Sequence, residues 1–554
     1  MVWPSVIVLS GGPQRPFDTR RTHSRVALAN GYSADCGTIA GSACHRRTWN
    51  PMSNELLVSY DTFPYQSHPF RQSHPDRLAT IGQLFGMTPP PVENSRVLEI
   101  GCASGGNLLP MAESLPNAEF VGVDLSPRQV EQGRDDVRRL GLANVRLVAM
   151  DISDFPAELG AFDYIIAHGV FSWVPMPVQE RLLGLCRSHL APSGIAYISY
   201  NALPGWRMRS VVRDAMIYHT RDATDPGIRV TQARAMLDFL EESTRDDVSA
   251  YGAMLRTEAE RLRRAPDDYL FHEHLEPVNQ PEYFYRFIER AAAHELAYLG
   301  EAEFSRMLGN EFGPSVAQTL ARVAPDVLRR EQYMDFLRNR SFRETLLVRK
   351  EVVLNRKVSP LRVMSLRIAS RARPVRDPPD LRTHAVEEFR TPEGHVLATP
   401  HRITKAAAVV LARHWPMSMT FDELHALSRT LLAGPDTSME DERGQLASDL
   451  MRCYGAGVAE LGGVPSPFVT HVSERPVVSA LARLQAGRGT RVANRRHELV
   501  TLDEDLCRLC QLLDGSRTRS DLSESVWRSP SSSGPSESTD SALERLALLA
   551  LLAG

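Results

Sequence analysis

The sequence predicts an α/β protein built around a Rossmann-like seven-stranded sheet, with a helical insertion and α+β winged-helix-like modules toward the C-terminus. Short apolar runs alternate with amphipathic helical patterns between residues 96 and 200. A turn rich in glycine follows the first apolar run, and two more apolar runs lie beyond residue 295. Together these observations favour parallel strands with helices on both faces of the sheet.

The strands are expected where short apolar runs stop at polar residues or glycine. We place five strands at about residues 96–100, 119–124, 145–149, 162–167 and 194–200, and helices near 107–114, 127–140 and 177–190. Runs at 296–301 and 345–349 would add strands six and seven and complete an antiparallel end of the sheet. The helical pattern between strands five and six is then an insertion over the carboxyl ends of the strands, where it would cover a bound substrate.

Pattern and composition also divide the chain into segments. We expect a disordered or mis-assigned N-terminal extension (1–51), a cap segment (52–95), a cofactor-binding core (96–205), a helical lid (206–294), the end of the sheet (295–350), a linker (351–400), a winged-helix-like domain (401–470), a second C-terminal module (471–520) and a serine-rich flexible tail with a terminal helix (521–554).

Length and composition are those of an ordinary globular protein of several domains. The chain has 554 residues, of which 43% are hydrophobic and 24% charged. A net charge of −3 gives no general attraction to nucleic acid or anionic lipid. Seven scattered cysteines do not form a disulfide framework and predict a reducing, cytoplasmic location. With no run of 18 apolar residues, we expect no membrane association.

The turn after the first strand is typical of a nucleotide-type cofactor site. Its sequence is Gly101-Cys102-Ala103-Ser104-Gly105-Gly106-Asn107. Small residues allow backbone N–H groups to approach a ligand closely. The absence of GxxxxGK[ST] excludes a P-loop, whereas Gly101-x-Ala103-x-x-Gly106 leaves a degraded dinucleotide fingerprint, and hence a hydride-transfer enzyme, as an alternative.

Three acidic residues at strand ends favour a different cofactor. Glu99, on the first strand, would repel a pyrophosphate but suits the ammonium group of an amino acid. Asp124 closes the second strand, where a carboxylate can bind both ribose hydroxyls. Asp151 closes the third, where an adenine amino group would lie. An adenosine that carries an amino acid is S-adenosylmethionine.

Several motifs resemble those of the class I S-adenosylmethionine-dependent methyltransferases, in the bacterial group that has a methyltransferase regulatory domain and includes the rickettsial protein lysine methyltransferases. The resemblance spans roughly residues 59–515. Its most specific segments are 59–65, 73–75, 98–107, 167–175, 200–206, 272–276 and 335–340. The general pattern has glycine where Ala103 stands, and we expect a negative φ there, which alanine tolerates. Because the resemblance begins just after Met52, translation is expected to start at that residue.

The site residues follow from these motifs. The residues expected to bind the cofactor are Glu99, Gly101, Ala103, Ser104, Gly105, Asn107, Asp124, Leu125, Gln129, Asp151, Ile152, His168 and Phe171. His168 and Tyr65 are the catalytic candidates, although His168 alternatively only hydrogen-bonds the backbone. Substrate contacts are expected from Tyr60, Trp173, Asn201 and Trp206. Core packing remains an equal alternative for the rings of Phe171 and Trp173.

Two further motifs invite a metal site. His272-Glu273-His274 is not HExxH, and two histidines two residues apart do not share a helix face. Cys507-x-x-Cys510 has no second pair to complete a zinc site and lies in an apolar helical pattern. We therefore expect no metal, a role for the first motif in fixing the lid, and core packing for the cysteines.

The resemblance implies methyl transfer to a protein, most directly to lysine. Such a transfer is an in-line displacement, so the enzyme must mainly align the donor with a neutral amine. Removing the proton of a lysine with a pKa near 10.4 at pH 7.4 costs roughly 4 kcal/mol. A small-molecule methyltransferase with accessory dimerisation or regulatory domains and a non-catalytic cofactor-binding regulator are the alternatives. The expected partners are a protein substrate and a second copy of the chain, with DNA binding by the winged helix a lesser alternative.

Overall fold

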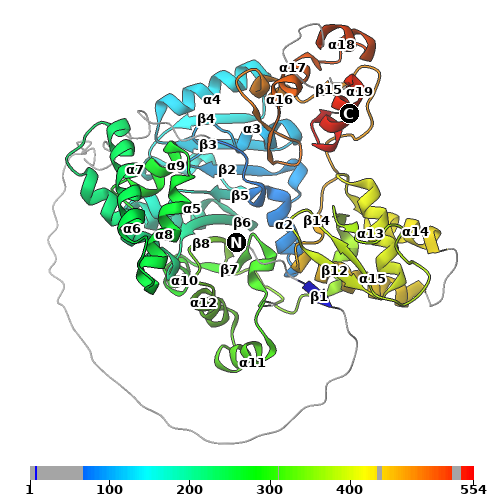
Figure 1. Ribbon diagram of the computed structural model, residues 1–554, viewed down its shortest axis with the longest axis horizontal. Helices are drawn as coiled ribbons and strands as arrows, with labels where there is room; N and C mark the ends of the chain where they lie inside the picture. Colours follow the sequence, from blue (N-terminus) through cyan, green and yellow to red (C-terminus); the bar gives the residue numbers. More distant parts are fainter. Residues whose placement is uncertain (1–5, 9–66, 310, 433–438, 527–537, 554) are drawn as a thin grey trace, which may run out of the picture.

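The computed structural model describes residues 6–8, 67–309, 311–432, 439–526 and 538–553 (Figure 1). Figure 1 shows a central sheet with helices α6–α9 at one side and two C-terminal modules, coloured yellow and red, at the other. No helix among the described residues is long and apolar enough to span a membrane.

A seven-stranded mixed sheet forms the centre of the molecule. Its order is β4-β3-β2-β5-β6-β8-β7, with parallel pairing from β4 to β6 and with β8 antiparallel to both of its neighbours. The strands are β2 (Arg96–Ile100), β3 (Glu119–Asp124), β4 (Val145–Ala149), β5 (Phe162–Ala167), β6 (Leu190–Asn201), β7 (Leu296–Glu301) and β8 (Phe342–Arg349). The predicted sheet and its antiparallel end are confirmed.

Two strands begin earlier than the sequence pattern predicts. β6 starts at Leu190 rather than near 194, because residues 190–193 continue the strand, with a register shift against β5. β8 starts at Phe342 rather than Thr345. Its second residue, Arg343, is completely buried, and a charged residue inside a sheet gives no apolar signal.

Helices cover both faces of the sheet. They are α3 (Leu108–Ser114), α4 (Pro127–Leu140) and α5 (Met176–His189), together with α2 (Pro75–Leu84) from the cap segment. Helix α4 begins at a Ser126 cap that accepts a hydrogen bond from the Gln129 N–H, and ends at Gly141 with φ of 65°. Alternation along β2 sends Val97 to one hydrophobic cluster and Leu98 to the other, so the sheet has two buried faces.

The insertion after β6 is helical, as predicted, and has a hydrophobic core of its own. Its helices are α6 (Gly205–Thr220), α7 (Pro226–Ser243), α8 (Ala250–Arg263), α9 (Asp267–His274) and α10 (Phe284–Ala293). Val212, Leu237 and Leu270 are among the residues of that core. A second group of helices, α11 (Pro314–Val323) and α12 (Val327–Arg338), was not predicted and connects β7 to β8.

The segment predicted as a linker contributes structure instead. It contains β9 (Arg367–Ala369), β10 (Arg373–Pro374), β11 (Glu387–Arg390) and β12 (Val396–Thr399). β9 lies between β13 (Met419–Thr420) and β14 (Glu460–Gly462), so residues 351–400 and 401–470 form one module. Its helices are α13 (Arg402–His414), α14 (Phe421–Leu432) and α15 (Met439–Gly455). These strands are two to four residues long, too short for a clear alternation of apolar residues.

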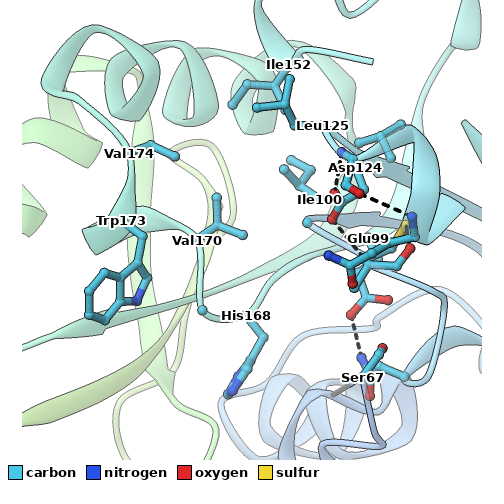
Figure 2. A pocket seen from close by; sticks show the side chains of 18 of the residues that line it. Ser67, Glu99, Ile100, Asp124, Leu125, Ile152, His168, Val170, Trp173 and Val174 are labelled. Atoms are coloured by element: carbon cyan, nitrogen blue, oxygen red, sulfur yellow. Dashed lines mark hydrogen bonds between the residues drawn. The ribbon is translucent and has the colours of Figure 1, made fainter. Parts of the chain in front are cut away.

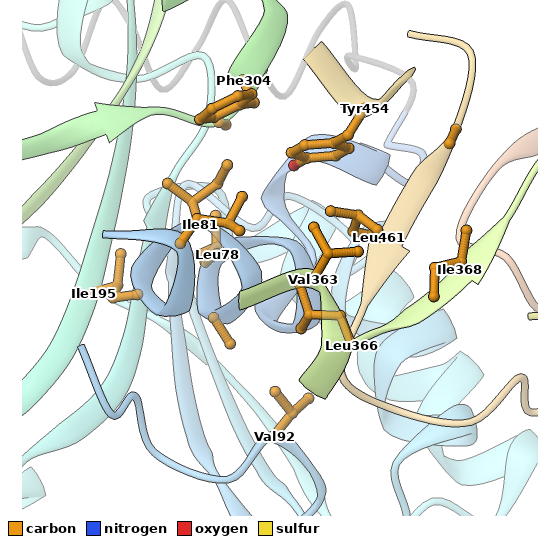
Figure 3. Close-up of a cluster of buried hydrophobic side chains, with 14 of the residues drawn as sticks. Leu78, Ile81, Val92, Ile195, Phe304, Val363, Leu366, Ile368, Tyr454 and Leu461 are labelled. Carbon is orange, nitrogen blue, oxygen red and sulfur yellow. The ribbon is translucent and has the colours of Figure 1, made fainter. Parts of the chain in front are cut away.

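This first C-terminal module shares a hydrophobic cluster with the sheet domain (Figure 3). In that cluster, Leu78 and Ile81 of α2 lie beside Val363, Leu366 and neighbouring apolar side chains of the module. Helix α2 therefore joins the sheet and the module through a continuous apolar core.

The second C-terminal module has its own small core. Its elements are β15 (Val477–Val478), α16 (Ala480–Ala486), β16 (Arg491–Ala493), β17 (Leu499–Thr501), α17 (Glu504–Leu512), α18 (Arg519–Val526), α19 (Thr539–Leu548) and β18 (Leu552–Ala553). Cys507 and Cys510 are buried in this core, as predicted. The terminal helix α19 packs into it as well, and β18 pairs with β15.

Of the N-terminal extension, the described residues are Val6–Val8, which form β1 and pair in parallel with β12. The remaining positions of residues 1–51, and the expected start at Met52, lie outside the described residues.

Candidate functional site

A cavity of about 240 Å³ lies at the carboxyl ends of β2, β3, β4 and β5. Figure 2 shows Glu99 and Asp124 on one side of this cavity, and Trp173 and Val174 on the opposite side. The insertion reaches it through His272 and Glu273 of α9. Open α/β sheets bind their ligands at this edge, where the strand order reverses.

The structure brings most of the predicted cofactor residues to this cavity. Those that line it are Glu99, Gly101, Ala103, Asn107, Asp124, Leu125, Gln129, Asp151, Ile152 and His168. Trp173, predicted for the substrate, lines it as well. They come together because each lies at or just beyond the carboxyl end of a parallel strand.

The turn after β2 has a strained alanine. Ala103 has φ of 49°, in the left-handed region, so the expectation of a negative φ was wrong. Its N–H donates to Asp124 Oδ2 at 2.8 Å, a hydrogen bond that fixes this conformation. The left-handed region costs a residue with a Cβ roughly 1–2 kcal/mol, which the surrounding contacts must offset.

The cap segment closes one wall of the turn. The Gly106 N–H donates to Ser67 Oγ at 2.7 Å, and a Cβ on Gly106 would collide with the Ser67 backbone. Likewise, a Cβ on Gly101 would collide with Val170 of the β5 loop. Glycine is needed at both positions because other segments approach the turn this closely.

Glu99 is a buried carboxylate with one oxygen unpaired. Its Oε1 accepts a hydrogen bond from Asn107 Nδ2 at 2.8 Å, whereas Oε2 is buried without a hydrogen-bond partner among the described residues. Burial, with a smaller contribution from the nearby Asp124, raises the pKa of Glu99 to about 8 against the opposing effect of the Asn107 hydrogen bond. An unsatisfied carboxylate at a cavity wall is expensive unless a cationic ligand completes it.

The other two acids are held by backbone hydrogen bonds. Asp124 accepts from Ala103 N at 2.8 Å through Oδ2 and from Ser126 N at 2.9 Å through Oδ1. Asp151 accepts from Ser153 N at 2.8 Å through Oδ1. Carboxylate oxygens accept hydrogen bonds, so groups of this kind suit the hydroxyl and amino groups of a ligand. These three carboxyl groups fit S-adenosylmethionine. Glu99 would supply an anion for the ammonium group, and Asp124 and Asp151 would supply hydrogen-bond acceptors for the ribose and the adenine.

His168 is part of a polar chain that leads away from the cavity. Its Nδ1 lies 2.8 Å from Tyr197 Oη, and Tyr197 donates to Glu344 Oε1 at 3.1 Å. The tyrosine oxygen therefore accepts from His168 Nδ1–H, which leaves Nε2 as the acceptor nitrogen. Burial lowers the pKa of His168 to about 3, and its ring stacks on Phe70 at 3.7 Å between centroids. His168 is thus a neutral, fixed wall residue and a poor base, and the hydrogen bond to the backbone considered from the sequence is replaced by one to Tyr197.

The wall formed by the insertion contains a carboxylate, Glu273, for which we expected from the sequence only a role in fixing the lid. Glu273 lines the cavity from α9, and burial raises its pKa to about 7 against the opposing effect of Arg209. Its neighbour His272 is buried, with Nδ1 3.2 Å from Glu276 Oε1. The motif therefore contributes both His272 and Glu273 to the cavity wall, and His272 also contacts Glu276 within the insertion. Among the described residues, no group of three or more histidine, cysteine, aspartate or glutamate side chains is placed to hold a metal.

Several predicted residues lie elsewhere. Phe171 is completely buried against Phe287 at 5.1 Å, so its ring is core. Ser104 and Gly105 do not line the cavity, because this part of the turn faces inward: a Cβ on Gly105 would meet Leu147. The cavity is lined by residues 101–103 and by Asn107 but not by residues 104–106 between them, a division that the composition of the turn does not reveal.

The remaining substrate candidates hold the lid or fall outside the described residues. Asn201 Nδ2 donates to Asn279 Oδ1 at 3.1 Å, which ties the end of β6 to the segment before α10. Trp206 is buried and stacks on His274 at 5.7 Å. Tyr60 and Tyr65 lie outside the described residues. Residues that sequence reasoning missed include Ser67, Phe70, Val170 and Phe342, which arrive from the cap, the β5 loop and β8.

Three family models match the chain. The model of a "Methyltransferase domain" matches residues 97–194, that of a "Predicted methyltransferase regulatory domain" residues 266–349, and that of a "PKMT, C-terminal winged helix domain" residues 474–532. The winged helix match falls in the region predicted as the second C-terminal module. The winged-helix-like assignment of residues 401–470 stays a prediction. The regulatory match covers α9 and α10 and extends through β8.

Relatives agree with these matches. The chain is 44% identical over 300 residues to the uncharacterized protein RP789 of Rickettsia prowazekii (strain Madrid E), a match that spans 54% of this chain and about half (54%) of RP789. It is 41% identical over 234 residues to RP028 of the same organism, which covers 42% of this chain and 94% of RP028.

A solved structure extends the similarity over most of the fold. PKMT2 from Rickettsia typhi superposes with a TM-score of 0.81 at 29% identity, covering 89% of this chain and all (100%) of PKMT2. The structure of PKMT2 in complex with AdoHcy gives a TM-score of 0.80. The chain therefore belongs to the class I S-adenosylmethionine-dependent methyltransferases, in the group that joins a methyltransferase regulatory domain and a PKMT-type C-terminal winged helix domain to the catalytic core.

Proposed function

We propose that the protein transfers a methyl group from S-adenosylmethionine to lysine side chains of a protein. The observation that carries this proposal is the cavity with an unpaired, buried carboxylate, Glu99, at its donor side and a second carboxylate, Glu273, on the lid at its acceptor side. Similarity to PKMT2 along 89% of the chain supports the same function.

On this proposal the donor is held by the three strand-end acids. Glu99 Oε2 binds the ammonium group, Asp124 the ribose hydroxyls and Asp151 the adenine amino group. When bound, S-adenosylmethionine supplies an electrophilic methyl group. The protein's contribution is to orient that group toward the opposite wall and to exclude water, since displacement at carbon needs alignment more than a covalent intermediate.

Glu273 has the properties needed to receive the target amine. A lysine ammonium has to lose its proton before it can attack, and its charge attracts it to a carboxylate. With a pKa near 7, the Glu273 carboxylate can accept that proton at neutral pH, which the His168 ring with a pKa of about 3 cannot. Trp173 lies across from Glu99 and offers a ring face beside the amine path.

The proposal is tested by incubating the full chain with methyl-labelled S-adenosylmethionine and a cell lysate. Label is expected in polypeptide, on lysine. Label that enters only small molecules would favour the small-molecule alternative, and donor binding without any transfer would favour a non-catalytic regulator.

The role of Glu273 is tested separately by Glu273→Gln. This variant keeps the shape of the side chain and removes the proton acceptor, so kcat is expected to fall about 100-fold while the affinity for S-adenosylmethionine, measured by calorimetry, stays unchanged. The matched control is Glu260→Gln on the neighbouring helix α8, an exposed carboxylate that pairs with Arg264 and does not line the cavity. Equal kcat values for E273Q and the wild type would contradict the assignment.

A further inference from the structure

A second cavity, of about 330 Å³, lies where four parts of the molecule meet. Its wall comes from α2 of the cap segment, α3 of the core, β9 and β14 of the first C-terminal module, and the turn between β16 and β17 of the second. It shares no lining residue with the cofactor cavity. Its size is within the range of small-ligand sites.

Positive charge dominates the wall of this cavity. Five arginines line it against three acids, Asp76, Glu93 and Glu460. Two of the arginines, Arg71 and Arg496, are paired with Glu460. The remaining three have no carboxylate partner among the described residues, and these are Arg77, Arg367 and Arg495.

The guanidinium groups of these three arginines donate hydrogen bonds only to neutral groups or make no hydrogen bond with the described residues. Arg367 donates to Ser418 Oγ at 3.2 Å, and the Arg495 Nε donates to the Pro467 carbonyl. Arg77 has no side-chain hydrogen bond or ion pair with any described residue, and its Nε is buried. Burial also lowers the pKa of Arg495. Guanidinium groups withdrawn from water without a counter-charge are costly, and an anion offsets that cost.

We propose that this cavity binds a small oxyanion, a molecule that bears a phosphate or carboxylate group, as an effector of the cofactor site. Planar guanidinium groups are suited to such anions because they donate paired hydrogen bonds. The hydroxyls of Ser418 and Ser466, which also line the cavity, add neutral donors for the same oxygens.

A short hydrogen-bond path joins the two cavities. His497 lines the oxyanion cavity, and its Nε2 lies 2.8 Å from Asn107 Oδ1. Asn107 Nδ2 in turn donates to Glu99 Oε1 at 2.8 Å. Because an amide oxygen can only accept, His497 is the donor, and His497 Nδ1 is buried without a partner. A negative charge placed beside His497 would change its hydrogen bond to Asn107, and through it the position and charge of Glu99.

The first experiment measures binding of inorganic phosphate to the full chain without cofactor or methyl acceptor, at constant ionic strength in sodium chloride. Saturable binding by calorimetry and a rise in Tm are expected, with citrate titrated in parallel to separate phosphate from carboxylate ligands. Arg77→Ala is expected to weaken binding at least tenfold. Arg139→Ala, which removes an exposed arginine of α4, is the matched control and should bind like the wild type.

Arg77 makes no ion pair, so its loss leaves no carboxylate unpaired. Should R77A still fail to fold, Arg77→Gln serves the same test with a side chain that stays polar. The proposal is overturned if neither anion binds saturably, or if the Arg77 variants and R139A bind alike.

The second experiment measures coupling. This part rests on the proposed cofactor site, whereas phosphate binding does not, so the two can fail separately. Saturating phosphate is expected to change the Kd for S-adenosylmethionine by at least threefold, and the donor must then change phosphate affinity by the same factor. In His497→Leu, phosphate should still bind but the coupling should vanish. An unchanged Kd in the wild type, or an equal change in H497L, would overturn the effector role.

Discussion

Two clusters of buried carboxylates lie on the same sheet and have different roles. We call the one around Glu99 the open cluster and the one around Arg343 the paired cluster. At the carboxyl end of β2, Glu99 has an oxygen without a partner. At β8, Arg343 is surrounded by Glu301, Glu331 and Asp335, and it donates to them at 2.6 to 3.0 Å. Buried charge that is fully paired stabilises the fold, whereas buried charge left open at a cavity wall indicates a ligand.

The β8 cluster explains why the segment 335–340 stands out in the sequence. Both Asp335 oxygens accept from Arg343, and Arg340 approaches Asp335 at 3.5 Å. The Arg343 guanidinium also lies 3.9 Å from the centre of the Phe284 ring, which links β8 to α10 of the insertion. This cluster therefore holds the lid-bearing part of the chain onto the sheet and takes no part in binding the donor.

The largest expected effect is the loss of stability when the paired cluster around Arg343 is disrupted. Asp335→Asn replaces the acceptor of two charge-assisted hydrogen bonds from Arg343 by an amide whose NH2 group faces the guanidinium, so the free energy of unfolding should fall by about 3–5 kcal/mol. Urea denaturation measures this loss. The affinity of the folded fraction for S-adenosylmethionine should not change. A variant that unfolds like the wild type would show that the network is not structural.

The second prediction concerns the open cluster, where a substitution should weaken ligand binding and not the stability of the fold. Glu99→Gln removes the charge that pairs with the donor ammonium, so the Kd should rise about 100-fold, equivalent to roughly 3 kcal/mol. The unfolding free energy at pH 8 should be no lower than that of the wild type. Burial raises the pKa of Glu99 to about 8, so the stability of the free protein falls as the pH rises from the unfolded-state pKa toward 8, and glutamine, which does not titrate, avoids that loss.

A surface carboxylate provides the control for E99Q. Glu119 lies at the other end of β3 and pairs with Arg96 at 2.8 Å, away from the cavity. Glu119→Gln should leave donor affinity unchanged. Equal losses in E99Q and E119Q would mean that general charge, and not the open oxygen, governs binding.

The pH dependence of binding sharpens the same comparison. Only ionised Glu99 pairs with the ammonium, and its pKa in the free protein is about 8. Donor affinity should therefore rise up to about tenfold per pH unit between pH 6 and 8, then fall as the donor's own α-amino group, with a pKa near 7.7–8.0, loses its proton. In E99Q the acid limb should be flat. An acid limb that persists in E99Q would assign the titration to another group.

The smallest expected effect concerns the strained turn. Ala103→Gly removes the left-handed strain of roughly 1–2 kcal/mol but adds chain entropy to the unfolded state, so stability should rise by about 0.5 kcal/mol. Ala112→Gly in the middle of α3 is the control and should lower it by about 1 kcal/mol or more. A loss of stability in A103G would show that the turn is not strained.

The sequence predicts the donor half of the site better than the acceptor half, for a physical reason. Glu99, Asp124 and Asp151 each end an apolar run, and parallel strands bring such ends to one edge of the sheet. Glu273 and Ser67 reach the cavity from an insertion and from the cap segment, and no local pattern gives their distance from the strand ends. They become visible only once the lid has been placed.

Backbone conformation and short elements limit prediction elsewhere. Nothing in the composition of the turn tells that Ala103 has a positive φ, because the Asp124 hydrogen bond that holds it comes from the next strand. The seven strands of the sheet were predicted because each contains a short, mainly apolar run of four or more residues. The strands between 367 and 399 were missed because each is two to four residues long, too short for a clear alternation of apolar residues.

The most direct test of the role of Glu99 measures how many protons the protein releases when it binds S-adenosylmethionine. Titration of the protein with S-adenosylmethionine at pH 7, in buffers of different ionisation enthalpy, gives the number of protons released on binding. If the open Glu99 oxygen receives the ammonium group, close to one proton should leave the wild type, because a group with a pKa of about 8 becomes ionised in the complex, and none should leave E99Q. Binding by the wild type without proton release, or with equal release in E99Q, would contradict the claim.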